Sequence, residues 1–148
     1  MEHVFIINPV AGRADARSFL LPQLEKAKRA LGLAAQVECT TRPGEAKDIA
    51  RRWAQKGAPV RLYACGGDGT LNEVFAGALG FTNAQVASVP CGSGNDFIRT
   101  FGQSSRFLDI AAQMNGRAVP IDLIETDSGV CAAICSVGVD SEVAYGIP

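Results

Sequence analysis

Short apolar runs alternate along this chain with longer stretches in which apolar residues recur every three or four positions. Each short run has four to six residues and ends near Gly, Pro or Asn, which is typical of a buried strand. The longer stretches have the spacing of amphipathic helices. Because Pro22 falls inside the first of them, that helix is either kinked there or begins later. The pattern predicts strands over residues 4–7, 35–40, 60–65 and 85–89, and helices over residues 15–31, from 45 to near 57, and from 71 to about 79.

Strands that alternate with helices of this length form a parallel sheet with helices on both faces, so we predict an α/β fold. In such sheets ligands bind beyond the carboxyl ends of the strands. The turns that follow three of the predicted strands are residues 8–12, 66–69 and 90–96, and the remaining strand leads into residues 40–44. All four connections should therefore emerge along one edge of the sheet and form a common site.

The last part of the chain has a different pattern. Residues 105–116 fit a helix, and residues 119–126 and 130–139 fit two strands joined by a turn, which predicts a β-hairpin. We therefore expect an α/β domain over residues 1–117 and the start of a β-rich domain, incomplete here, over residues 118–148. The edges of a lone hairpin invite pairing, so a homodimer formed through it is a hypothesis.

Residues 66–73 carry the strongest chemical signal, because three glycines surround the carboxylate of Asp68. Thr70 and Glu73 fit a capping box, in which both side chains bind free amides at the start of their own helix. A strand that turns through glycines onto a helix N-terminus presents N–H groups and the positive end of the helix dipole, which suits phosphate. Asp68 can hold a cation or take a proton from an attacking hydroxyl. The alternative is an ordinary tight turn, in which Asp68 fits the backbone conformation and has no chemical role.

Residues 90–96 repeat this logic in the connection after the last strand. Ser93 can cap a helix that begins near Gly94, and Gly92 allows a ligand to approach the backbone closely. Asn95 can reach a ribose hydroxyl or a phosphate. The same segment also fits an ordinary helix start without any ligand.

The composition narrows the classes of function. The chain has 148 residues, 47% of them hydrophobic and 20% charged, with a net charge of −1, so it is typical of a globular domain and gives no indication of a nucleic-acid partner. The only histidine is His3, which argues against a zinc site and against Ser-His-Asp or Cys-His catalysis. Neither the P-loop motif nor the dinucleotide-binding GxGxxG motif is present, so phosphate charge would fall to backbone amides, helix dipoles and a divalent cation.

The first residues and the cysteines bear on the compartment. The apolar stretch near the N-terminus has four residues, which is too short for a signal peptide or a membrane span. The five cysteines lie in or beside apolar runs and lack the paired CxxC spacing of a metal site. This usage predicts buried, reduced thiols in a cytosolic protein.

Taken together, these motifs resemble the catalytic domain of diacylglycerol kinases, which is shared with sphingosine kinases and, more distantly, with NAD kinases and phosphofructokinases. The resemblance rests on residues 8–12, 66–73, 90–96 and 136–140, and on Thr40, which occur in the order of the family. It implies a Rossmann-like α/β fold of the NAD kinase and diacylglycerol kinase kind. It also implies ATP-dependent phosphorylation of a membrane lipid hydroxyl, with diacylglycerol as the default acceptor.

The resemblance further implies a site. Asp68 would orient Mg²⁺ or assist deprotonation of the lipid hydroxyl, and Glu73 would mainly cap its own helix. The implied setting is cytoplasmic, with peripheral contact to the inner membrane surface. ATP would lie across the strand ends against the residues that match the motifs, which are Asn8, Pro9, Gly12, Thr40, Gly66, Gly67, Asp68, Gly69, Thr70, Leu71, Asn72, Glu73, Gly92, Ser93, Asn95 and Asp96.

Two departures from the family pattern shape the interpretation. Bacterial soluble members are roughly twice as long, and their β-rich second half closes over the lipid. Ala133 also stands where the family usually has Asn. We therefore interpret the chain as the nucleotide-binding half of a lipid kinase, inactive on its own. The alternatives are an NAD kinase-like kinase of a soluble substrate and a non-catalytic nucleotide-binding fragment.

Overall fold

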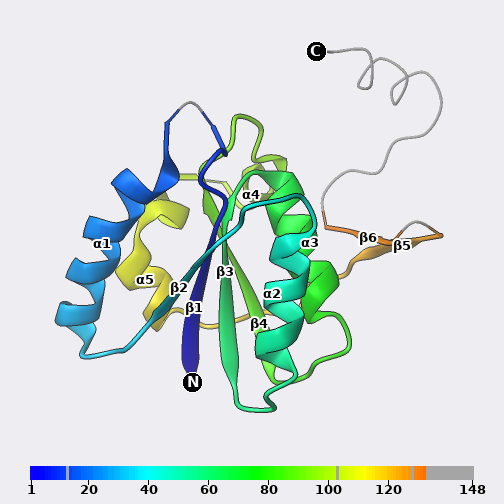
Figure 1. The fold of residues 1–148 in the computed structure, drawn as a ribbon, viewed down its shortest axis with the longest axis horizontal. Coiled ribbons are helices and arrows are strands. Elements are labelled where there is room, and N and C mark those ends of the chain that lie inside the picture. Colours follow the sequence, from blue (N-terminus) through cyan, green and yellow to red (C-terminus); the bar gives the residue numbers. More distant parts are fainter. Residues whose placement is uncertain (13, 103, 128, 133–148) are drawn as a thin grey trace.

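The computed structural model describes residues 1–12, 14–102, 104–127 and 129–132. Its centre is a four-stranded parallel sheet in the order β2-β1-β3-β4, with helices on both faces (Figure 1). The predicted α/β class is therefore confirmed. The strands are β1 (Glu2–Ile7), β2 (Gln36–Cys39), β3 (Val60–Gly66) and β4 (Ala84–Pro90).

Two apolar layers hold the helices against the sheet, because successive side chains of a strand point to opposite faces. Phe5 and Tyr63 face the layer beneath α1 and α5, where their rings stack with centroids 4.0 Å apart. Val4 and Leu62 face the layer beneath α2 and α3. The helices are α1 (Ala16–Leu31), α2 (Glu45–Ala54), α3 (Asp68–Ala78), α4 (Asp96–Arg99), the 3-10 helix η1 (Ser104–Leu108) and α5 (Ile110–Asn115).

Helix α1 settles the question raised by Pro22. The helix begins at Ala16 and runs through Pro22, so the later start is wrong. Asp15 explains the early start, because its side chain accepts a hydrogen bond from the backbone amide of Arg17 at 2.9 Å and so caps the helix. This cap fixes the first turn before the proline is reached.

The single helix predicted over residues 105–116 is wrong. The segment forms η1 and then α5, and the break lies at Asp109. The carboxylate of Asp109 accepts a hydrogen bond from the amide of Ala112 at 2.9 Å, so it starts a new helix instead of continuing the old one. The local N-cap preference of aspartate therefore outweighs the continuous apolar spacing.

The predicted hairpin is present, but its first strand is shorter than expected. The antiparallel pair consists of β5 (Ile124–Thr126) and β6 (Gly129–Cys131), and residues 119–123 are not a strand. The predicted strand positions 133–139, the motif at 136–140 and Ala133 lie outside the described residues.

The cysteines differ in how deeply they are buried. Cys65 is buried as predicted and Cys91 is half-buried, but Cys39 is exposed, so the prediction of a buried thiol is wrong there. Cys39 is the last residue of β2, an edge strand with a neighbour on one side only, and three of the four residues of this strand are exposed. Within the described part of the chain, no helix is both long and apolar enough to cross a membrane.

Candidate functional site

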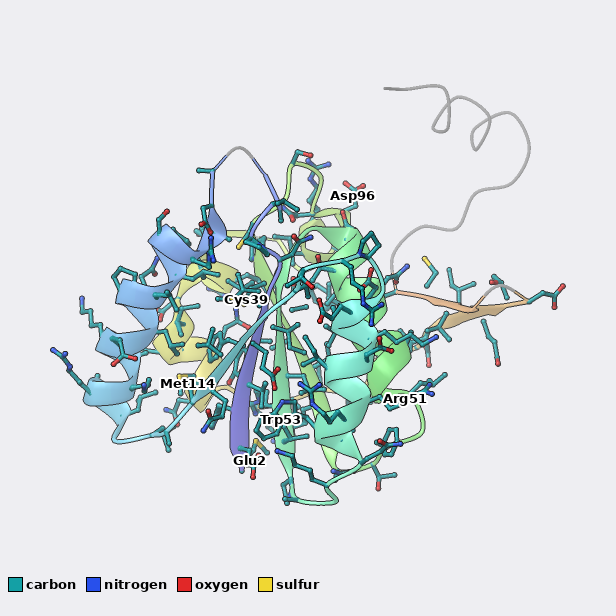
Figure 2. The ribbon with its side chains drawn as sticks, in the orientation of Figure 1. Glu2, Cys39, Arg51, Trp53, Asp96 and Met114 are labelled. Carbon is teal, nitrogen blue, oxygen red and sulfur yellow. The ribbon has the colours of Figure 1, made fainter. Side chains whose placement is uncertain are left out.

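The connections predicted to converge do so at the carboxyl edge of the sheet. Asn8 follows β1, Thr40 follows β2, and the glycine turns follow β3 and β4. Hydrogen bonds between neighbouring strands continue into these connections: the Asn8 amide donates to Cys65 at 2.9 Å, and the Cys91 amide donates to Gly66 at 2.9 Å. Figure 2 places Asp96 at this edge and Glu2 at the opposite one.

Two glycines let the turns touch backbone to backbone. Gly12 has a φ of 82°, and a Cβ added there would overlap the carbonyl oxygen of Cys91. A Cβ on Gly92 would lie 2.5 Å from the Cα of Gly67. The close turns border an open cavity of about 380 Å³. Its lining residues are Asn8, Ala11, Gly12, Gly67, Asp68, Gly69, Thr70, Gly92, Ser93 and Gly94.

Helix α3 begins at Asp68, three residues earlier than predicted, with Gly67 as its N-cap. The predicted capping box is therefore wrong, because Thr70 already lies inside the first turn. Its side chain is buried, and its hydroxyl oxygen accepts a hydrogen bond from the side-chain amide of Asn8 at 3.3 Å. The first turn of an α-helix has backbone N–H groups without partners inside the helix, and those of α3 border the cavity between the turns.

Glu73 caps a different helix from the one predicted. Its carboxylate accepts hydrogen bonds from the backbone amides of Gly44, at 2.9 Å, and Ala46, at 3.1 Å. These amides belong to the start of α2, whose N-cap Gly44 has no side chain to bind them. The expectation that Glu73 caps its own helix is therefore wrong, because its own helix starts too early and α2 packs beside it (Figure 1).

Asp68 plays the same part toward α4. Its two carboxylate oxygens accept hydrogen bonds from the amides of Asp96, at 3.0 Å, and Phe97, at 3.2 Å. The predicted cap by Ser93 is wrong, because α4 begins at Asp96 and its N-cap is Asn95. Asn95 adopts a φ of 57°, which asparagine tolerates, and its side-chain amide donates to the carbonyl of Gly92 at 2.6 Å.

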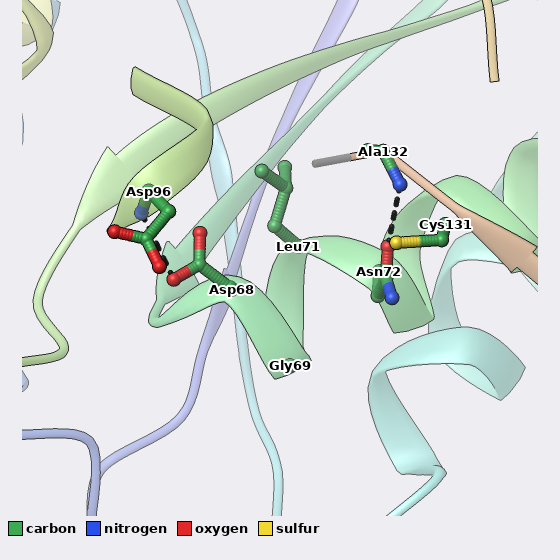
Figure 3. A pocket seen from close by; sticks show the side chains of 7 residues that line it. All are labelled: Asp68, Gly69, Leu71, Asn72, Asp96, Cys131 and Ala132. Atoms are coloured by element: carbon green, nitrogen blue, oxygen red, sulfur yellow. Dashed lines mark hydrogen bonds between the residues drawn. The ribbon is translucent and has the colours of Figure 1, made fainter. Parts of the chain in front are cut away.

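Asn72 connects the glycine helix to the hairpin. Its side-chain oxygen accepts a hydrogen bond from the amide of Ala132 at 3.0 Å (Figure 3). Leu71, beside it in the sequence, is buried in the core. A small cavity of about 140 Å³ lies here, and Figure 3 shows the carboxylates of Asp68 and Asp96 at one end of it. Its lining residues are Asp68, Gly69, Leu71, Asn72, Asp96, Cys131 and Ala132.

A larger cavity of about 520 Å³ lies over the ends of β1 and β2. Six predicted site residues contribute to it, which are Asn8, Pro9, Thr40, Gly69, Thr70 and Glu73. Sequence reasoning missed the other residues of its wall, although three of them belong to the connection after β2, which was singled out as a turn. These additional residues are Val10, Arg17, Cys39, Thr41, Arg42, Pro43 and Ala46.

Titratable groups near the edge limit the chemistry. Burial raises the pKa of the Cys91 thiol to about 11, so Cys91 is protonated near neutral pH and is no nucleophile. Hydrogen bonds from the backbone and then the hydroxyl of Thr41 hold the pKa of Glu45 below its usual value. In the described ranges, no cluster of three or more His, Cys, Asp or Glu side chains could hold a metal ion. Asp68 and Asp96 are the two carboxylates that line the small cavity, and one oxygen of Asp96 also accepts a hydrogen bond from Arg99 at 2.7 Å.

Comparisons with known proteins agree with the resemblance seen in the sequence. The model of the diacylglycerol kinase catalytic domain matches residues 2–126. The chain is 33% identical over 146 residues to the diacylglycerol kinase of Bacillus subtilis, and the alignment covers 97% of this chain and 48% of that protein. It is 35% identical over 134 residues to a Pseudomonas aeruginosa protein named "probable lipid kinase YegS-like", covering 90% of this chain and 42% of that protein.

The fold gives the same answer. A diacylglycerol kinase crystal structure from Bacillus anthracis superimposes with a TM-score of 0.67 and 25% identity, over 87% of this chain and 47% of that chain. The chain thus spans about half the length of the relatives that it matches. Both the sequence match and the structural match extend over most of the described residues, and the chain belongs to the diacylglycerol kinase catalytic domain family.

Proposed function

We propose that this chain is the ATP-binding half of a lipid kinase, which transfers the γ-phosphate of ATP to a hydroxyl of a membrane lipid such as diacylglycerol. One observation carries the proposal. Three glycine-containing turns touch at the carboxyl edge of the sheet, and the first turn of α3 borders the cavity between them. Such amides and the positive end of a helix dipole are suited to a polyphosphate.

The three cavities suggest how the substrates lie. The cavity of about 520 Å³ over β1 and β2 has room for a nucleoside, and the one between the turns suits the phosphates. The small cavity beside Asp68 and Asp96 would take the acceptor hydroxyl. Gly69 lines all three, which supports an end-to-end arrangement along the start of α3.

The acidic pair fits magnesium bound together with a nucleotide. Mg²⁺ prefers oxygen ligands and is usually held by one or two carboxylates together with substrate phosphates and water. Asp68 and Asp96 line one cavity and would supply those carboxylates, and the ion would neutralise charge on the phosphates. A site made of protein side chains alone would need more ligands than this pair offers.

The chemistry asked of the chain is mainly positioning. The acceptor oxygen would form a bond to the γ-phosphorus while the bond to the β–γ bridging oxygen breaks and ADP leaves. Asp68 would accept the hydroxyl proton or orient the cation. Each of its oxygens accepts one backbone amide, and a carboxylate oxygen has two lone pairs, so acceptor capacity remains on both.

The relatives suggest how the rest of the enzyme is organised. Because the chain spans about half of their length, we propose residues 1–117 as the nucleotide-binding domain and 118–148 as the start of a β-rich lipid-binding domain. The lipid would be reached from the inner membrane surface by peripheral contact. On its own this chain is expected to bind nucleotide without transferring phosphate.

Nucleotide binding is tested by thermal unfolding. Magnesium-ATP should raise the melting temperature of the chain, and Asp68→Asn should weaken that increase. Asp109→Asn is a matched control, since Asp109 also caps a helix but lies outside the cavities described above. Protection that is absent in the wild-type chain, or equal in wild type and Asp68→Asn, would contradict the proposal.

The acceptor is tested by phosphate transfer. Radiolabelled ATP would be incubated with the protein encoded by the longest open reading frame that contains this chain. One reaction would contain a lipid extract and the other NAD. Label in the organic phase supports the lipid kinase. Label on NAD would favour a kinase of a soluble substrate, and label on neither would favour a nucleotide-binding fragment.

A further inference from the structure

Glu73 connects helix α3 to a segment far away in the sequence. Its two carboxylate oxygens bind the amides of Gly44 and Ala46, which lie 29 and 27 residues earlier. The side chain is half-buried between α3 and α2, and a negative charge at the N-terminus of α2 complements the dipole of that helix. The contact therefore joins two elements that both border the large cavity.

The segment held by Glu73 forms one wall of that cavity. At its start, the amide of Thr40 donates to the carbonyl of Ile7 at 2.9 Å and anchors the segment to β1. Within the segment, the Thr41 hydroxyl donates a hydrogen bond to the Glu45 carboxylate at 2.9 Å. Near its end, Gly44 has a φ of 82° and no side chain, so Glu73 holds the amides of Gly44 and Ala46 in place.

The glycine turns after β3 and β4, where the phosphates are proposed to bind, are held by other contacts. Gly67 and Gly92 touch directly, and the amide of Cys91 donates to the carbonyl of Gly66. Asp68 holds the start of α4. None of these contacts includes Glu73, so a change at Glu73 should reach the wall of the large cavity before it reaches the turns.

We propose that Glu73 is a positioning residue that sets the shape of the nucleoside cavity by holding residues 40–46 in place, without touching the phosphates. The inference rests on the proposed function, because it assigns the nucleoside to the cavity over β1 and β2. It gives this glutamate of the glycine motif a role separate from that of Asp68. Loss of the carboxylate should loosen the nucleoside and leave the polyphosphate bound.

The test compares two ligands in the same variant by calorimetry. Glu73→Ala removes both hydrogen bonds that hold the segment, and the displaced wall should weaken magnesium-ATP about tenfold while magnesium-tripolyphosphate stays within about twofold of wild type. Glu73→Gln keeps one acceptor oxygen and should fall between. Glu38→Ala is the matched control: Glu38 binds Trp53 and Arg52 farther along α2, at 2.7 and 2.6 Å, and should leave both ligands unchanged.

A second measurement uses no ligand. In Glu73→Ala, and more weakly in Glu73→Gln, the amides of Gly44 and Ala46 should exchange hydrogen faster, while that of Cys91 should keep its rate. Equal weakening of ATP and tripolyphosphate, or unchanged exchange at Gly44 and Ala46, overturns the inference. A wild-type chain that binds neither ligand overturns the proposed function instead, and hydrogen exchange then decides whether Glu73 holds the segment. If Glu73→Ala fails to fold, Glu73→Gln decides both measurements.

Discussion

Gly69 offers a sharp test, because nothing in the fold requires a glycine there. It lies in the first turn of α3, and a Cβ built on it meets no heavy atom within 4 Å. Yet it borders all three cavities at the sheet edge. We interpret the missing side chain as room for the phosphates. Gly69→Ala should therefore stabilise the chain and at the same time weaken nucleotide binding.

Both magnitudes follow from the local structure. Alanine is favoured over glycine in a helix by about 0.5–1 kcal/mol, and for a chain of this size 1 kcal/mol shifts the melting temperature by about 2–4 °C. The variant should therefore melt roughly 1–4 °C higher. A methyl group beside the amides prevents a phosphate oxygen from reaching hydrogen-bond distance. Losing one charge-assisted hydrogen bond, about 1.5–3 kcal/mol, weakens binding roughly 10- to 150-fold.

The assay measures the melting temperature without ligand and the magnesium-ATP affinity by titration calorimetry. Gly92→Ala is the companion variant, because its Cβ would lie 2.5 Å from Gly67, where ordinary contact begins at 3.4 Å, so the turns must separate by roughly 0.9 Å. Such overpacking costs about 1–3 kcal/mol, and this variant should lose both stability and binding. A stabilised Gly69→Ala with wild-type affinity would refute the placement of phosphate on α3. A destabilised one would refute the early helix start.

Two further predictions concern the opposite edge of the sheet. The buried guanidinium of Arg61 donates to the carbonyls of Gln113, at 2.6 Å, and Gly116, at 2.8 Å. Arg61→Met should therefore lower the free energy of unfolding by about 2–4 kcal/mol in a urea titration. A change in ATP affinity would argue against this purely structural role. Burial, and then the charges of Arg61 and the N-terminus, lower the pKa of His3 from 6.5. The unfolded chain therefore binds the proton more readily than the folded chain, so the stability that is present above pH 6.5 is lost as the pH falls through the lowered pKa. The free energy of unfolding, measured from about pH 7.5 to about pH 5, should fall as the pH falls, and His3→Gln should reduce this slope.

The sequence was a good guide to the sheet and to the edge where the turns meet. Apolar runs mark buried strands, and β3, predicted over residues 60–65, is observed as Val60–Gly66. The convergence of Asn8, Gly67 and Gly92 followed from parallel strands alone, because their carboxyl ends must share an edge. These features depend on burial and chain direction, which a local pattern records.

Partners far apart in the sequence could not be predicted in the same way. Thr70 and Glu73 have the spacing of a capping box, but Glu73 binds amides that lie 27 and 29 residues away. Asp68 likewise caps a helix whose amide is 28 residues later in the chain. A local pattern shows that a carboxylate and a free helix start exist, and only packing decides which carboxylate meets which helix.

The side chains of the glycine motif can now be given a common physical role. A carboxylate beside a triphosphate would repel it, so Asp68 and Glu73 need compensation if they stand near a polyphosphate site. Both find it at the N-terminus of another helix, Asp68 at α4 and Glu73 at α2, while Asn72 binds the hairpin at Ala132. The first turn of α3, whose backbone amides have no partner inside the helix, borders the cavity. In the proposed site the uncharged backbone would receive the anion and Glu73 would act on the geometry alone, whereas Asp68 would also act on the attraction for phosphate through the cation that it would help to hold.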